Sequence, residues 1–475
     1  MNKLIWLSSP LLGLFFVASY YANNLVLFLP IQVVPAIIGT IILCSLISLA
    51  AYLFSKNKLR ANLISILVVA GIFTWGYSSV VSIVLLFGAM VLGFTQVKDK
   101  ILVHSNRIAL LLMVGLLVVP LFNIVVYHAG IKYKPINEVV SKSHSPDIYY
   151  IVLDSYTSDD VMASLGYDNS YFTDYLKEKG FVIREDAFCN YPRTYMSVPS
   201  TLTMDYLKNP EDMGENYHLI QTNRVFEQAH ELGYKVINLS SNWCGTEKIK
   251  YADENYGLNY FQYDSFTSQV WRSMILGNIN LMPLMPEIQR NYISYQLSML
   301  SKFPGDVETQ PRFIFAHILI PHHSFALFHS DGSDLRPSDD LTVNYVYFQH
   351  LEYINKEMVK VIDGIINHSK EKPIIILQSD EGISTDEFYS LVYTKEWINE
   401  PKLMKQRASI LSAYYLPTEV DIPRSSVNTF RIVFNEYFGG DYEILDDVFY
   451  YPKVYVINGS GAPSKGLYDA TDVIR

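Results

Sequence analysis

The stretch that decides the fold is Pro146–Tyr206, which begins PDIYYIVLDSYTSDD and ends AFCNYPRTYMSVPSTLTMDY. Its residues Asp147–Leu153 are an apolar run rich in β-branched and aromatic side chains, which is typical of a strand buried on both faces. The run stops at Asp154. We therefore expect a carboxylate at the carboxyl end of a strand, where open α/β sheets bind their ligands.

The end of the same stretch is rich in hydroxyl groups. Arg193 and Thr194 stand just before Ser197–Ser200, where serine and proline predict the start of a helix. A helix N-terminus attracts anions, and a hydroxyl beside it can attack an anion that is held there. Thr194 is therefore a candidate nucleophile.

The rest of the C-terminal part alternates between helix and strand patterns. Helices are predicted over 169–179, 219–232, 262–300 and 339–368, and strands over 181–183, 234–237, 313–320 and 373–377. This alternation predicts an α/β domain with a mainly parallel central sheet flanked by helices.

Three of the apolar strands end in residues that can bind a metal. Asp154 follows the first, His322 follows the strand over 313–320, and Asp380 with Glu381 follows the strand over 373–377. Because the carboxyl ends of parallel strands lie at one edge of a sheet, we expect these side chains to meet.

The N-terminal part lacks charge over long stretches, namely Leu4–Ser55, Ala61–Val97 and Ile108–Ile131. A membrane-spanning helix needs about 20 apolar residues. We predict five transmembrane spans, at about 4–22, 32–54, 61–78, 80–97 and 108–129. A cleaved signal peptide is the alternative for the first span, but no clear small-residue cleavage site follows it.

Basic residues fix the expected orientation. They lie in the loops at 56–60 and 98–107, and positively charged loops stay in the cytoplasm. We therefore expect a multi-pass protein of the cell membrane, with a membrane domain at 1–129, a tether at 130–146 and an extracytoplasmic catalytic domain at 147–475.

Charge excludes one class of partner. Beyond residue 135 the chain has 28 basic and 46 acidic residues, a net charge of about −18, which argues against nucleic acid. Cys189 and Cys244 lie in this part. An oxidising compartment permits a disulfide between them, and two unpaired buried thiols are the alternative.

These residues resemble the alkaline phosphatase and sulfatase superfamily, and in particular its membrane-anchored lipoteichoic acid synthases and phosphoethanolamine transferases. Those enzymes begin the domain with a strand that ends in a metal-binding Asp or Glu, which Asp154 matches. They carry a threonine nucleophile three residues before Ser-Val-Pro, which Thr194 matches. Sulfatases place a cysteine six residues before the Ser of a Ser-Leu-Leu-Thr run, and counting back from Ser200 again gives Thr194.

The resemblance implies one divalent metal ion held by Asp154, Thr194, Asp380 and Glu381. In the resembled enzymes the last strand ends Asp-His-Gly, whereas this chain has Asp380-Glu381-Gly382. Such an all-oxygen set favours manganese or magnesium over zinc. If Glu381 turns away instead, the site loses a ligand and the protein is inactive.

The resemblance also assigns roles around the metal. His322 matches a histidine that faces the substrate phosphate, and is a candidate acid or base. Arg193 could clamp a phosphate or be a surface charge. We expect His317 to be structural, because it precedes His322 by an odd number of residues, and His323 to meet solvent.

The expected function is transfer of a phospho-headgroup, phosphoethanolamine or phosphoglycerol, from a phospholipid to a cell-envelope glycan or lipid through a phosphothreonine intermediate. A sulfatase-like phosphodiester or sulfate ester hydrolase is the first alternative. However, Thr194 cannot form the sulfatase formylglycine, and Met196 and Val198 replace the Pro and Arg of the sulfatase Cys-x-Pro-x-Arg setting. A catalytically inactive membrane scaffold is the second alternative.

Overall fold

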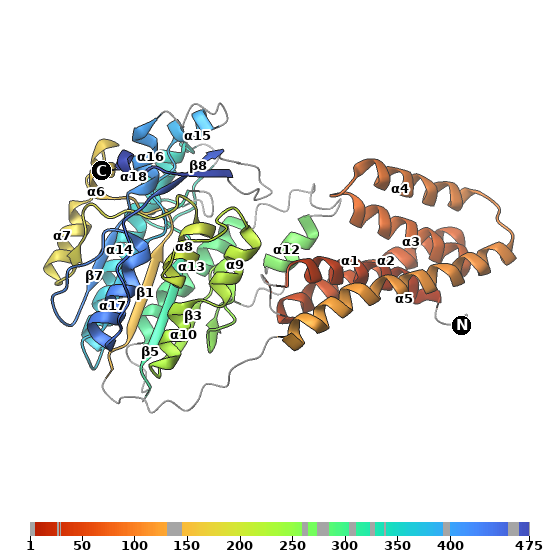
Figure 1. The fold of residues 1–475 in the computed structure, drawn as a ribbon. Helices are drawn as coiled ribbons and strands as arrows, with labels where there is room; N and C mark the ends of the chain where they lie inside the picture. Colours follow the sequence, from red (N-terminus) through yellow and green to blue (C-terminus); the bar gives the residue numbers. More distant parts are fainter. Residues whose placement is uncertain are drawn as a thin grey trace. The chain divides into compact units, whose positions relative to one another are not determined.

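The chain folds into two units, one helical and one α/β. In the computed structural model the first unit is Met1–Pro135 with Asn259–Met282, and the second is Ile136–Leu258 with Pro283–Arg475. The structure describes residues 5–25, 28, 30–130, 145–258, 265–272, 285–303, 310–323, 328–336, 339–392, 400–454 and 465–474. Figure 1 shows both units, coloured along the sequence.

Five long helices make up most of the first unit, and they match the five expected spans in number and place. They are α1 (Ser8–Asn23), α2 (Pro30–Ser55), α3 (Lys58–Thr74), α4 (Ser79–Phe94) and α5 (Asp99–Gly130). Pro30–Ser55 and Asp99–Ala129 are long and apolar enough to cross a membrane, with mean hydropathies of 2.5 and 2.8. Ser79–Phe94 is apolar but shorter.

Several polar side chains of this unit are buried, whereas many apolar side chains are exposed. The Asn62 amide donates to Asn106 Oδ1 at 2.7 Å, and both residues are fully buried. Leu111 and Val119 of α5, by contrast, are 72% and 65% exposed. Exposed apolar surface of this extent marks contact with lipid or with another protein.

A sixth helix of the unit, α12 (Ser265–Arg272), comes from the middle of the sequence and packs on α2. Its Phe266 is buried among the rings of Tyr20, Tyr21 and Phe28. Of the helical pattern expected over 262–300, α12 and α13 (Met285–Lys302) are described, and 273–284 lie outside the described residues.

The α/β unit is built on a seven-stranded sheet. Across the sheet the order is β2 (Val182–Ile183), β7 (Ser412–Tyr415), β6 (Ile374–Ser379), β1 (Ile148–Leu153), β5 (Arg312–Ile318), β3 (Lys235–Leu239) and β4 (Glu254–Tyr256). Only β7 runs antiparallel to its neighbours, so the predicted mainly parallel sheet is confirmed. A separate pair, β8 (Tyr450–Val454) and β9 (Lys465–Asp469), is antiparallel.

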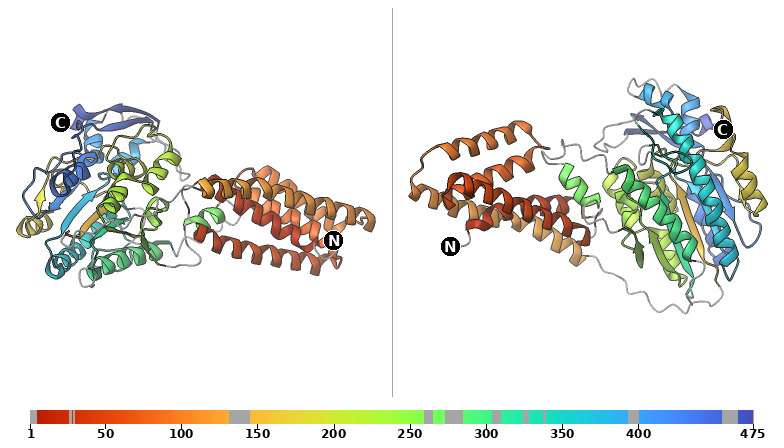
Figure 2. Two further views of the ribbon diagram at one scale, coloured as in Figure 1. Left: turned by 60° about the horizontal axis from the view of Figure 1, so that its bottom comes forward. Right: turned by 180° about the vertical axis from the view of Figure 1, so that it is seen from behind.

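Helices cover both faces of this sheet. On one face α7 (Ser170–Glu178), α13 and α14 (Val343–His368) share a core with Tyr149, Ile151 and Leu153 of β1. Figure 2 shows α13 and α14 side by side over the sheet.

On the other face lie α8 (Thr194–Thr203), α10 (Arg224–Glu231) and α17 (Thr429–Phe438), where Tyr150 packs on Phe315 and Phe430. All six residues of β1 are buried, as its apolar run predicts. The remaining helices are α6 (Asp159–Ser164), α9 (Met213–Gln221), α11 (Cys244–Glu247), α15 (Asp386–Val392), α16 (Pro401–Ala408) and α18 (Thr471–Ile474).

Helix α8 begins three residues earlier than the sequence pattern indicated. The Arg193 carbonyl accepts hydrogen bonds from the N–H groups of Met196 and Ser197 at 2.9 and 2.8 Å, so the first turn forms at Thr194. Pro199 therefore lies inside the helix rather than at its start. The consequence is that Thr194 itself occupies the first helical position.

Candidate active site

The register of the sheet brings the strand-end carboxylates together. Leu153 is the Cα partner of Ser379 on β6 and of Ile318 on β5. The residues that follow, Asp154 and Asp380, therefore leave the same edge of the sheet on neighbouring strands. Both are buried, with exposures of 1% and 3%.

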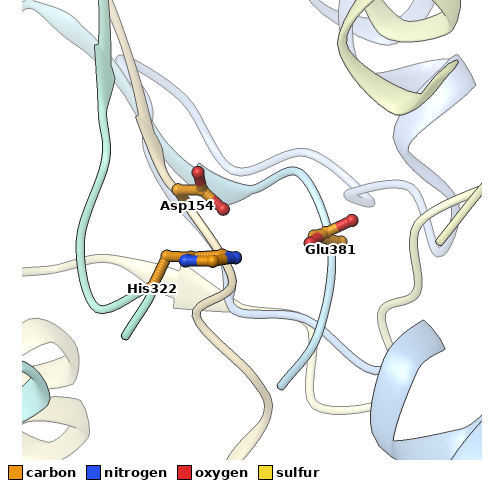
Figure 3. A group of neighbouring side chains, drawn as sticks. All are labelled: Asp154, His322 and Glu381. Carbon is orange, nitrogen blue, oxygen red and sulfur yellow. The ribbon is translucent and has the colours of Figure 1, made fainter. Parts of the chain in front are cut away.

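Two overlapping groups of side chains at this edge could hold a metal ion. In the first, Asp154, His322 and Glu381 offer ligand atoms that all lie within 4.8 Å of one another. Figure 3 shows these three side chains pointing toward a common space. In the second, Asp154, His317 and Asp380 meet the same criterion. Asp154 belongs to both, so it is the centre of the cluster.

Ser155 contacts all three carboxylates of the site. Its φ of +65° places it in the left-handed region, which a non-glycine residue adopts at a cost and which occurs preferentially at functional sites. In this conformation its N–H donates to Asp380 Oδ1 at 3.2 Å. Its hydroxyl lies 3.1 Å from Asp154 Oδ1 and 3.2 Å from Glu381 Oε1, and can donate to either.

Crowding of buried carboxylates makes the site electrostatically strained. Burial raises the pKa of Asp154 well above its usual range, and the charges of Asp380 and Glu381 raise it further. Burial, reinforced by Glu381, raises the pKa of Asp380 to about 7. A divalent cation would relieve both causes at once, because it replaces lost water and cancels the mutual repulsion.

Two buried atoms at the site have no hydrogen-bond partner among the described residues, which is further support for a metal. They are Oδ2 of Asp380 and Nε2 of His317. Buried polar groups in folded proteins nearly always have partners, so each orphan calls for an explanation. Both atoms are of types that bind divalent ions, and the residues present therefore fit a metal site.

His317 was expected to be structural, but the structure places it in the candidate metal cluster. Its Nδ1 is 3.0 Å from the Thr246 hydroxyl, which leaves Nε2 facing Asp154 Oδ2 at 3.9 Å. Burial lowers the pKa of His317 to about 3, so the ring is neutral and able to act as a ligand. The spacing between His317 and His322 does not decide which way their side chains point, because β5 ends at Ile318 and the alternation of a strand does not continue beyond it.

His322 is half-buried, and its ring stacks on His323 with centroids 4.9 Å apart. Burial and the nearby His323 and Arg407 lower the pKa of His322 well below its usual value. The ring is therefore neutral at pH 7, with one nitrogen lone pair that can accept a proton or bind a cation and one N–H that can donate a hydrogen bond. His323 is half-buried rather than fully exposed to solvent.

Thr194 is half-buried in the first turn of α8, and a hydrogen bond from its hydroxyl lowers the pKa of Asp380. The proposed nucleophile and the strand-end carboxylate are thus neighbours. Arg193 is the residue before the helix and is half-buried as well. Its role as a phosphate clamp stays a prediction.

Arg407 is a site residue that the sequence did not reveal. It is 2% exposed, and its Nη2 lies 2.7 Å from Glu381 Oε2. A single arginine in the run MKQRASIL carries no motif, so only the fold could place it here. Cys189, close by, is a free thiol that donates to the Arg407 carbonyl at 3.5 Å, and neither it nor Cys244 is in a disulfide.

Comparisons with known proteins give structural neighbours alone. No protein-family model and no curated protein matches the chain. A zinc complex of the periplasmic domain of EptC from Escherichia coli is similar over 69% of this chain and 94% of that one, at 15% identity and a TM-score of 0.46.

Two further neighbours extend the comparison. The integral membrane protein lipooligosaccharide phosphoethanolamine transferase A from Neisseria meningitidis is similar over 87% of this chain and 88% of that one, at 13% identity and a TM-score of 0.38. The phosphonate monoester hydrolase of Agrobacterium radiobacter is similar over 65% and 80%, at 10% identity and a TM-score of 0.40. At these identities and TM-scores the neighbours carry no argument about activity, which depends on the side chains described above.

Proposed function

We propose that this protein is a membrane-bound, metal-dependent transferase that moves a phospho-headgroup, phosphoethanolamine or phosphoglycerol, from a phospholipid to a cell-envelope glycan or lipid. The observation that carries the proposal is the meeting of Asp154, Asp380 and the Thr194 hydroxyl at one edge of the sheet, where Oδ2 of Asp380 is buried and has no hydrogen-bond partner among the described residues. Such an arrangement would place a hydroxyl nucleophile beside a cation that neutralises a phosphate.

The chemistry proceeds in two displacements at phosphorus. Thr194 Oγ1 forms a bond to the donor phosphate and loses its proton, while the bond to the diacylglycerol oxygen breaks and that oxygen gains a proton, so that diacylglycerol leaves. The acceptor hydroxyl then attacks the phosphothreonine and loses its proton, while the bond to Thr194 breaks and the threonine oxygen regains a proton. His322 is neutral and can accept the proton of an attacking hydroxyl.

Asp154, Asp380, Glu381 and the Thr194 hydroxyl would hold the metal, with His317 and His322 within reach as nitrogen donors. When bound, the ion would lower the pKa of the threonine hydroxyl and neutralise phosphate charge. The donor set remains rich in oxygen. We therefore propose manganese or magnesium in preference to zinc.

The helical unit supports placement in the cell membrane, with the C-terminal domain outside the cytoplasm. Its buried amides and exposed apolar side chains match a lipid environment, and the basic loops give the orientation. A reporter that is active only outside the cytoplasm, fused after Lys134, is expected to be active. The same reporter fused after Lys58 should be silent. If only the Lys58 fusion is active, the orientation in the membrane is the opposite of the one proposed.

The function is tested on the full-length protein in lipid nanodiscs that contain a phospholipid labelled in its phospho-headgroup. With manganese present, label should appear covalently on the protein in acid-stable form and disappear when an acceptor lipid or glycan is added. Release of the label to water without any acceptor would identify a hydrolase instead. A protein that takes up no label under any condition would support the scaffold alternative.

A further inference from the structure

Arg407 ties the two loops of the candidate site together. Its Nη1 donates to the Gly382 carbonyl at 2.5 Å, and its Nη2 donates to the Pro192 carbonyl at 2.5 Å and pairs with Glu381 Oε2 at 2.7 Å. Pro192 belongs to the turn that leads into Thr194, whereas Glu381 and Gly382 follow β6. One buried guanidinium thus spans the nucleophile turn and the metal-binding strand end.

The backbone holds Arg407 in this place. Gly382 packs directly against the chain at 406–409, so that a Cβ added there would lie 2.0 Å from the Gln406 carbonyl oxygen. The Gly382 N–H donates to the Arg407 carbonyl at 2.9 Å, and the Cys189 N–H donates to the Ala408 carbonyl at 2.9 Å. Because main-chain contacts fix both sides, the guanidinium needs little rearrangement to reach Glu381.

The two carboxylate oxygens of Glu381 have different partners. Its Oε2 is held by Arg407, whereas its Oε1 lies 3.2 Å from the Ser155 hydroxyl, and Glu381 is one of the three residues of the first group that could hold an ion. Among the described residues, the basic side chains within ion-pair distance of Asp154, Asp380 or Glu381 are Arg407 and His317, and the His317 ring is neutral. Arg407 therefore supplies the compensating positive charge of the cluster.

We propose that Arg407 is a positioning residue with two effects. It cancels the charge of Glu381 while leaving Oε1 to face the ion, and it fixes the turn that presents Thr194 to that ion. The inference rests on the proposed function only in taking the strand-end carboxylates as a metal site. An arginine is suited to this, because its planar fork donates in several fixed directions at once, which a lysine cannot do.

The charge effect is tested by titrating manganese calorimetrically into the full-length protein in detergent, for Arg407→Met, Glu381→Gln and the double variant. Arg407→Met leaves three carboxylates without their cation, so manganese should bind at least about tenfold more tightly than in wild type. Glu381→Gln leaves the arginine unpaired beside the site, so binding should weaken by about tenfold or more. The double variant restores the net charge and should return to within about threefold of wild type.

The positioning effect should change the rate of transfer without weakening the binding of manganese. In the headgroup-transfer assay, kcat of Arg407→Met should fall about 100-fold although the metal binds more tightly, because the Thr194 turn loses its anchor. Arg407→Lys keeps the charge, so its manganese affinity should stay within about threefold while kcat still falls about tenfold.

Arg312→Met is the matched control. Arg312 is buried and bonded to Asp147 at 2.6 Å, at the opposite end of β1 and about 20 Å from Asp154. It should lower thermal stability and leave manganese affinity unchanged.

Three results would count against the proposal or its basis. If both single variants weaken manganese binding and the double variant is no better than either, Arg407 only holds the fold together, and the inference is wrong. If Arg312→Met weakens binding as much as Glu381→Gln, loss of stability explains the effect, which also overturns it. If the wild-type protein binds no divalent ion, the metal site itself fails and with it the proposed function.

Discussion

Thr194→Ala is expected to lower turnover by about 10³-fold or more, because the oxygen that attacks phosphorus is removed and the remaining groups supply only binding and charge stabilisation. Thr194 is half-buried at the first position of α8, and its substitution leaves the sheet core untouched. The midpoint of thermal unfolding should therefore change little. Transfer of labelled headgroup in nanodiscs, together with covalent labelling of the protein, measures the effect.

Thr194→Ser is the conservative control variant, because it keeps the hydroxyl and removes only a methyl group. We expect it to form the covalent intermediate and to retain turnover within about tenfold of wild type. Ser197, whose buried hydroxyl lies one turn further along α8, is the control for hydroxyl loss without nucleophile loss. If Thr194→Ala still becomes labelled, a different residue is the nucleophile.

Asp380→Asn is expected to change stability in opposite directions with and without metal. In the metal-free protein it relieves repulsion among buried carboxylates and should raise the thermal midpoint. With saturating manganese it removes a ligand, so the stabilisation by the ion should largely vanish. Thermal unfolding of the full-length protein, measured in chelator and in excess manganese, tests both. Asp421→Asn, at a 98% exposed carboxylate, should have no effect in either condition.

The same carboxylate predicts a pH dependence of the metal-free protein. The pKa of Asp380 is raised from an ordinary 3.8 to about 7, so the folded state binds a proton that the unfolded state has lost. Stability should therefore fall as pH rises from about 4 to 7, and this slope should be smaller in Asp380→Asn. A wild-type midpoint that rises over this window in chelator would contradict the assignment.

The sequence predicted the framework of the site because strand ends are encoded locally. The apolar run before Asp154 and the short run before Asp380 each stop at a carboxylate, and parallel register then places the two side by side. The helical pattern before Gly180 and Gly233 was equally local, since both glycines adopt positive φ where helices end.

What the sequence could not predict depends on contacts between distant segments. Arg407 reaches Glu381 only because Gly382 allows close packing of two backbones, which no spacing rule encodes. His317 reaches Asp154 because β5 ends just beyond it and α11 supplies Thr246 as the partner of its other nitrogen. The start of α8 was misplaced because Ser197 and Pro199 carry helix-start signals, whereas the Arg193 carbonyl starts the first turn.

The association of α12 with the helical unit determines which proteolytic cuts can release the α/β unit. The chain passes between the two units at 135–136, at 258–259 and at 282–283, so a protease that cleaves only the tether separates 1–135 from the rest of the chain but leaves α12 packed on α2. Release of the α/β unit then requires that α12 dissociate from α2 or be cut out of the chain. A fragment that begins at residue 146 would carry Phe266 and Val270, which are 0% and 2% exposed in the whole protein, without the helices that bury them. A soluble fragment of the α/β unit is therefore expected to behave best when 259–282 is removed together with the tether.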